Sequence, residues 1–195
     1  MTSYIISYKF HFTGIAARRW EVNILKLKKL RSFSGLDRYQ KEIRKSRPEE
    51  RCIVAVCTDA GCRACGSSGV YEAFVREISR RRMADRVDVK ATGCHGFCEE
   101  GALVVIHPER ILYTKVTPGD VPDIVAETIR KGVVVERLLY RDPESKERIV
   151  REDDVPFYRK QHRLILGDNT RIDPGQITDY IALDGYRALK TVLEE

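Results

Sequence analysis

The chain has 195 residues, of which 43% are hydrophobic and 33% are charged, so it can bury a core and is expected to be soluble and globular. Its formal net charge is +6, but the excess lies in the first 50 residues, which hold 12 Lys and Arg against 5 Asp and Glu. The rest of the chain is almost neutral, which argues against nucleic-acid binding. No apolar run approaches the ~20 residues that cross a membrane, and we expect no secretory signal. These features predict a cytoplasmic protein, in which six cysteines indicate metal or redox chemistry rather than structural disulfides.

Residues 1–47 are predicted to form a basic N-terminal extension with one helix. Apolar and lysine side chains between residues 22 and 30 also fit a basic amphipathic helix on a membrane surface, but a poorly ordered extension is the simpler interpretation. Leu36, Tyr39 and Ile43 then recur at helical spacing and predict a helix that closes before Pro48.

Residues 48–132 alternate between short apolar runs and amphipathic segments. The predicted elements are a strand at 52–56, a helix from Ser67 or Ser68 to Arg80, a strand at 87–91, a hairpin of 103–106 and 111–115, and a helix that Thr117 caps and Gly132 ends. A strand–helix–strand unit is almost always a right-handed crossover between parallel strands. The order of elements therefore predicts an α/β fold.

Residues 133–195 contain few apolar positions for their length. A stretch of about 60 residues buries too small a fraction of its surface to be stable alone. A last helix is predicted from about Asp173 to Leu193. We expect this segment to be a docking element that leaves its apolar side chains uncovered.

Four of the six cysteines form two closely spaced pairs. Cys57 and Cys62 enclose four residues, and Cys94 and Cys98 enclose three. Each pair follows a predicted strand, so parallel strands would bring both pairs to the same edge of the sheet. A [2Fe-2S] cluster takes two protein thiolates at each of its two irons, which two such pairs supply. From spacing alone, structural zinc and a disulfide redox pair remain alternatives.

Two further cysteines and a histidine lie close to these pairs in the sequence. Cys52 falls within the first predicted strand and is expected to be a small buried side chain. Cys65 lies three residues after Cys62, and its thiol could replace one of the four paired cysteines as a ligand. His95 invites a Rieske-type interpretation, but four cysteines already complete the site, so we expect a turn residue that modulates the potential.

Several stretches together carry a resemblance to a known family. They are VCTDAGC at 56–62, GS at 66–67, VYEA at 70–73, TGCHGFCEEGALVV at 92–105, VPFYRKQ at 155–161, RIDP at 171–174 and YIALDGYRAL at 180–189. The chain resembles the thioredoxin-like [2Fe-2S] ferredoxins. It is similar in particular to the branch at the N-terminus of the flavoprotein subunits of NAD(P)-reducing hydrogenases and formate dehydrogenases. Those subunits are in turn similar to the NADH-binding subunit of respiratory complex I.

The resemblance implies a thioredoxin-like ferredoxin domain at residues 48–132, followed at 133–195 by a linker and an incomplete lead-in to a flavin-binding domain. It supports one [2Fe-2S] cluster on the four paired cysteines, Cys57, Cys62, Cys94 and Cys98. It implies an electron-transfer module of an NADH dehydrogenase-like or NAD(P)H-linked oxidoreductase, whose partners are flavoprotein and other iron–sulfur subunits. No catalytic residue is implied.

The sequence also departs from that family. It has no glycine-rich loop of the G-R-G-G-x-G-F-P kind and no later cysteine group for a [4Fe-4S] cluster, and Asp184-Gly185 stands where two glycines are common. We therefore expect a truncated flavoprotein subunit or the product of a split gene, without FMN and NADH sites of its own and inactive alone. The alternative is a zinc-stabilised, non-redox interaction domain in an assembly.

Overall fold

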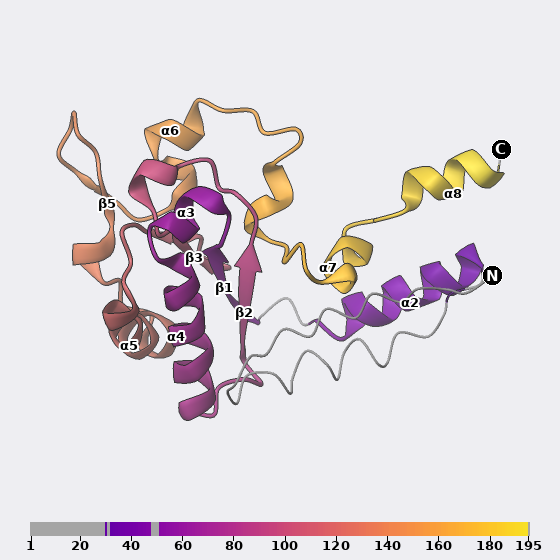
Figure 1. The fold of residues 1–195 in the computed structure, drawn as a ribbon, viewed down its shortest axis with the longest axis horizontal. Helices are drawn as coiled ribbons and strands as arrows, with labels where there is room; N and C mark the ends of the chain where they lie inside the picture. The colour runs from indigo at the N-terminus through magenta and orange to yellow at the C-terminus, as the bar shows by residue number, and fades with distance from the viewer. Residues whose placement is uncertain (1–29, 31, 48–50, 195) are drawn as a thin grey trace, which may run out of the picture. The chain divides into compact units, whose positions relative to one another are not determined.

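The structure is a computed structural model, and it describes residues 30, 32–47 and 51–194. The chain divides into two compact units, Met1–Arg38 and Tyr39–Glu195. Helix α2 (Phe33–Lys45) crosses the boundary between them, and every strand and all the other helices described belong to the second unit (Figure 1). The predicted helix before Pro48 is thus confirmed. The proposed amphipathic helix at 22–30 lies almost entirely outside the described residues.

The second unit is built on a four-stranded sheet of order β2-β1-β3-β4. Its strands are β1 (Cys52–Cys57), β2 (Val87–Thr92), β3 (Val104–His107) and β4 (Ile111–Tyr113). β1 and β2 are parallel and are connected through helix α4 (Ser67–Arg80), whereas the β1–β3 and β3–β4 pairs are antiparallel. This order confirms the predicted strand, helix, strand and hairpin, and with them the α/β class.

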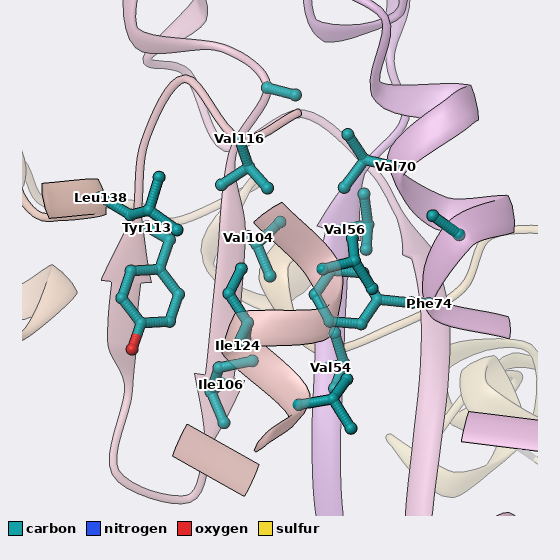
Figure 2. Packing of buried hydrophobic residues seen from close by; sticks show 14 of the residues in the cluster. Val54, Val56, Val70, Phe74, Val104, Ile106, Tyr113, Val116, Ile124 and Leu138 are labelled. Carbon is teal, nitrogen blue, oxygen red and sulfur yellow. The ribbon is translucent and has the colours of Figure 1, made fainter. Parts of the chain in front are cut away.

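The two faces of the sheet carry separate hydrophobic clusters, because successive side chains of a strand point to opposite faces. On β1, Val54 and Val56 belong to the first cluster, whereas Ala55 and Cys57 belong to the second. Figure 2 shows the first cluster, in which Phe74 of α4 packs among the strand valines. Full burial of such a side chain stabilises the fold by roughly 1.5–3 kcal/mol.

A helix after β4 completes this first layer. Thr117 and Asp120 form a capping box at its start, in which the main-chain amide of Thr117 donates to Oδ2 of Asp120 at 2.8 Å. Three consecutive stretches make up the helix: a 3-10 turn (Pro118–Asp120), α5 (Val121–Asp123) and a π-helical stretch (Ile124–Ile129). Gly132, with φ of 71°, follows the last turn, as the sequence predicted.

The chain after Gly132 packs on both faces of the sheet and on the edge of β4. The amides of Leu112 and Thr114 donate to the carbonyls of Val150 and Leu138, each at 2.9 Å. These main-chain bonds cover the edge strand, which would otherwise leave unpaired polar groups. The small hairpin that supplies part of this cover consists of β5 (Tyr140–Arg141) and β6 (Arg148–Ile149).

The expectation that this segment leaves its apolar side chains uncovered is wrong for part of it. Val155 and Tyr158 are buried in the same cluster as Cys57. Leu164 and Ile165, in contrast, are 84% and 90% exposed. One part of the segment therefore belongs to the hydrophobic core of the sheet, and another part faces solvent. The division into domains at residue 132 stays a prediction.

The last helix predicted at 173–193 is also wrong, because the chain breaks it in two. The final helices are α6 (Pro156–Arg159), α7 (Ile177–Ala182) and α8 (Arg187–Glu194). Between α7 and α8, Asp184 and Tyr186 have φ of 62° and 67°, values that end a right-handed helix. Within the part of the chain that the structure describes, no helix combines the length and apolar character needed to cross a membrane.

Candidate metal centre

The two cysteine pairs meet where β1 and β2 end. Cys57, the last residue of β1, is the register partner of Thr92, the last residue of β2. The amide of Thr58 donates to the carbonyl of Thr92 at 3.0 Å, so the pairing continues into the loops. Cys94 follows two residues later. The prediction that parallel strands bring both loops to one edge is confirmed.

The loops approach each other closely at two glycines. Cys62 lies on the short helix α3 (Ala60–Ala64), which the sequence did not reveal because five residues show no helical period. A Cβ on Gly61 would lie 2.8 Å from Sγ of Cys98, and a Cβ on Gly101 would lie 3.2 Å from Sγ of Cys62. Each loop therefore needs a glycine where it approaches a cysteine of the site.

The four thiols interact with one another. Cys57 is hydrogen-bonded to Cys62, and Cys94 is hydrogen-bonded to Cys98. Electrostatic interactions connect the pairs, between Cys57 and Cys94 and between Cys62 and Cys98. A [2Fe-2S] cluster asks for two thiolates at each iron, and this donor set fits it. Among the described residues, no three Cys, His, Asp or Glu side chains are grouped as a single ion would require.

The thiols of the first pair differ in acidity. The hydrogen bond from Cys62 lowers the pKa of Cys57 to about 6, against the effect of burial and with help from main-chain amides. The same hydrogen bond, together with burial, raises the pKa of Cys62. Burial raises the pKa of Cys94 as well.

The loop that follows β2 and carries Cys94 is called the second loop below. Its main-chain amides point at the sulfurs. The amide of Gly96 donates to Sγ of Cys94 at 3.3 Å, and the amide of His95 is hydrogen-bonded to Cys57. Gly96 has φ of 87°, which a residue with a side chain rarely adopts. Hydrogen bonds to sulfur tune the potential of an iron–sulfur centre, so this loop is equipped for that task.

The site is closed on one side and open on the other. Cys57 and Cys62 are each only 1% exposed, whereas Cys94 is half-buried and Cys98 is exposed. The second loop is therefore the side of the site that solvent and other molecules reach.

The two remaining cysteines lie in different surroundings. Cys52 begins β1, five residues before Cys57, and is therefore roughly 16 Å from it along an extended strand. It is half-buried, and burial together with the charge of Glu109 raises its pKa to about 11. Cys65 is exposed and lies at the rim of the site, where its Sγ is 3.4 Å from the position of a Cβ on Gly101.

The His95 imidazole contacts Thr92. The ring is buried, and its Nε2 lies 2.8 Å from Oγ1 of Thr92. Burial and the nearby charge of Arg163 lower the pKa of His95 to about 3, so the ring is neutral. The Nδ1 atom of the ring has no hydrogen-bond partner among the described residues, and the role of His95 as a turn residue that modulates the potential stays a prediction.

A segment far along the chain contacts the start of the second loop, and sequence reasoning missed it. Nη2 of Arg163 donates to the carbonyl of His95 at 2.7 Å, and Nδ2 of Asn169 donates to the carbonyl of Cys94 at 3.4 Å. These partners are 68 and 75 residues apart in the sequence. No periodic or cysteine-based signal marks either side chain, so nothing in the sequence pointed to them.

Comparison with known proteins decides the family. The model of the thioredoxin-like [2Fe-2S] ferredoxins matches residues 25–129, more than half of the chain. The chain belongs to the thioredoxin-like [2Fe-2S] ferredoxin family. Its cofactor is a [2Fe-2S] cluster, and its function is electron transfer. The family thus favours the cluster over the zinc and disulfide alternatives that the cysteine spacing left open.

Two relatives of this ferredoxin agree with the assignment, and one solved structure is also similar to the chain. A 2Fe-2S ferredoxin of Clostridium pasteurianum is 40% identical over 77 residues, which are 40% of this chain and 76% of the relative. A 2Fe-2S ferredoxin of Aquifex aeolicus (strain VF5) is 34% identical over 79 residues, or 40% of this chain and 71% of the relative. A solved thioredoxin-like [2Fe-2S] ferredoxin from Aquifex aeolicus is 32% identical, with a TM-score of 0.43, and the match covers 46% of this chain and 89% of that chain.

Proposed function

We propose that Cys57, Cys62, Cys94 and Cys98 bind the [2Fe-2S] cluster and that this ferredoxin passes single electrons within an NAD(P)H-linked oxidoreductase complex. When bound, the cluster supplies a one-electron couple. The observation that carries the ligand assignment is the meeting of two hydrogen-bonded thiol pairs at the end of β1 and β2.

The chain contributes positioning rather than acid–base chemistry. The buried first pair anchors the site in the hydrophobic core, while exposed Cys98 leaves one side open to a partner. The amides of His95 and Gly96 stabilise negative charge on the sulfurs. We place the docking of electron donors and acceptors at the second loop, because it is the accessible side of the site.

The resemblance of residues 155–189 to the lead-in of a flavin domain supports a flavoprotein and other iron–sulfur subunits as partners. Val155 and Tyr158 of this region pack in the cluster that contains Cys57, so the region is in direct contact with the metal-site side of the fold. The 195 residues contain no glycine-rich phosphate-binding loop of that family. We therefore assign flavin and nicotinamide binding to residues outside this sequence.

Metal analysis tests the ligand assignment. The chain purified without oxygen should contain two irons and two acid-labile sulfides, because four thiolates complete one cluster. Serine at any of the four proposed ligands should bleach the visible absorption or leave it unstable. Cys52→Ser is the matched control and should keep the full iron content, because Cys52 lies at the other end of β1. Normal iron content and absorption in a Cys94→Ser variant would refute the assignment.

Reduction by NADH tests the partnership. With NADH alone, the absorption of the bound cluster should stay unchanged. Adding an FMN-containing, NADH-oxidising flavoprotein subunit should bleach it. Copurification of about one FMN per chain would show that flavin binds here, and absence of reduction with the flavoprotein present would contradict the partnership.

A further inference from the structure

Two peptide units at the start of the second loop lie between the cysteine sulfurs and the segment that contains Arg163 and Asn169. In the unit that joins Cys94 to His95, the carbonyl accepts a hydrogen bond from Nδ2 of Asn169 at 3.4 Å. The amide of the same unit, that of His95, is hydrogen-bonded to Cys57. One peptide unit thus connects Asn169 to a proposed ligand.

The next peptide unit repeats the arrangement. The carbonyl of His95 accepts a hydrogen bond from Nη2 of Arg163 at 2.7 Å. The amide of this unit, that of Gly96, donates to Sγ of Cys94 at 3.3 Å. A peptide unit is planar and trans, so its C=O and N–H point in opposite directions. A side chain that holds the carbonyl outward therefore also holds the amide inward, toward the sulfur.

Each of the two side chains is itself held in place. The guanidinium of Arg163 lies 4.3 Å above the centre of the Tyr158 ring, and Tyr158 is buried in the core. Asn169 lies against the main chain of the loop, where a Cβ on Gly93 would approach its Cγ and Nδ2 to 3.2 Å. Arg163 is therefore anchored on the core, whereas Asn169 is packed against the loop itself.

We propose that Arg163 and Asn169 are positioning residues that aim the amides of His95 and Gly96 at the cysteine sulfurs and so raise the reduction potential of the bound cluster. The inference rests on the proposed ligand set. Two effects act in the same direction, because aligned amides stabilise the extra negative charge of the reduced state and Arg163 adds a permanent positive charge beside the loop.

The two residues lie beyond the region that defines the family. The family match ends at residue 129, whereas Arg163 and Asn169 belong to the segment that follows it. Potential tuning by this segment is therefore a property that the ferredoxin match does not itself predict.

Potentiometric titration of the holoprotein tests the proposal, with iron and sulfide content measured first in every sample. Arg163→Gln removes the charge and the guanidinium donor. Asn169→Ala removes the weaker bond. Arg159→Gln, which removes the same charge from an exposed position of the same segment, is the matched control. We expect R163Q to lower the equilibrium constant for reduction of the cluster about tenfold, which is a fall of about 59 mV in the potential of a one-electron couple. N169A should lower this constant less. R159Q should leave it within about twofold of the wild-type value.

The outcomes separate this proposal from the function proposed above. If the wild-type protein does not contain two irons, the ligand assignment is refuted, and this inference falls with it. A fully loaded R163Q protein whose potential is unchanged, raised, or shifted no more than that of R159Q would overturn the inference and leave the ligand assignment intact. If R163Q does not retain the cluster, Arg163→Met serves as a second neutral variant. If both variants lose the cluster, the loaded N169A protein decides: a lowered potential would support the inference, and an unchanged one would overturn it.

Discussion

Lys90 and Asp179 form an ion pair inside the protein, with Nζ of Lys90 2.7 Å from Oδ2 of Asp179 and only 8% and 4% of the two side chains exposed. The carboxylate also accepts a hydrogen bond from the amide of Asp173 at 2.8 Å and pairs with Arg47 at 2.6 Å. Lys90 lies on β2, whereas Asp179 lies on α7, 89 residues later. This carboxylate therefore ties the late part of the chain to the sheet that carries the metal site.

Removing Asp179 should destabilise the fold strongly. Asp179→Ala leaves Lys90 buried without a counter-charge, and breaking a buried pair in this way costs about 3–5 kcal/mol. Glu136→Ala is the control, because its pair with Arg148 is exposed on both sides and should contribute less than about 1 kcal/mol. Urea unfolding followed by circular dichroism measures both, and equal midpoints for the two variants would contradict the prediction.

Asp179 should also make stability depend on pH in the acid range. Burial opposes its ionisation, but the hydrogen bonds from the Asp173 amide and Lys90 and the nearby charges of Lys90 and Arg47 keep its pKa below the ordinary value. A carboxylate with a depressed pKa in the folded state contributes stability above its unfolded pKa of about 4, and this contribution is lost as the pH falls through the folded value. The free energy of unfolding should therefore fall below about pH 4 in the wild type. Asp179→Asn should fall less steeply there, and parallel pH profiles would argue against this role.

Gly61 should be required for cluster binding because of its contact with Cys98. A Cβ at this position would lie 2.8 Å from Sγ and 2.9 Å from Cβ of Cys98, so Gly61→Ala must push the two loops apart. We expect loss of most of the iron and visible absorption. Gly69→Ala is the control, since its nearest neighbour would be 3.4 Å away and alanine is favoured over glycine in a helix by about 1 kcal/mol. Full iron content in G61A would show that the loops can adapt.

The sheet and the cysteine loops could be predicted because their signals are local. The apolar runs of β1 and β2 stand out, and each is followed within a few residues by a cysteine pair. The crossover rule then fixes the strands as parallel and places Cys57 and Cys94 at one edge. The start of α4 was less well predicted, because Gly66, in a left-handed conformation with φ of 85°, precedes Ser67 where a serine cap was expected.

The contacts of the late segment could not be predicted, because distant parts of the chain determine them. The sequence from 173 to 193 has a helical pattern, yet the chain turns at Asp184. There Gln40 donates to Oδ1 of Asp184 at 3.0 Å and to the carbonyl of Ile181 at 2.7 Å. Such tertiary contacts override local helix preference. Lys90, which lies in a predicted strand, gives no sign in the sequence of its buried partner.

Limited proteolysis should distinguish the buried part of the late segment from its exposed part. Residues 138–158 cover the edge of β4 and the second face of the sheet, whereas Leu164 and Ile165 are almost fully exposed. Proteases cut exposed chain that opens without disturbing a core.

Within residues 131–195, trypsin should therefore cut the native protein first after Arg159 or Lys160, at the exposed end of α6, and not after Lys131. The main chain around Lys131 is hydrogen-bonded, with the amides of Gly132 and Val133 donating to carbonyls of the preceding helix at 3.0 Å each. Mass spectrometry of the early fragments gives the answer. A first product that ends at Lys131 would mean that residues 138–158 detach readily and that the hydrophobic contact between Val155 and the metal-site side of the sheet contributes little to stability.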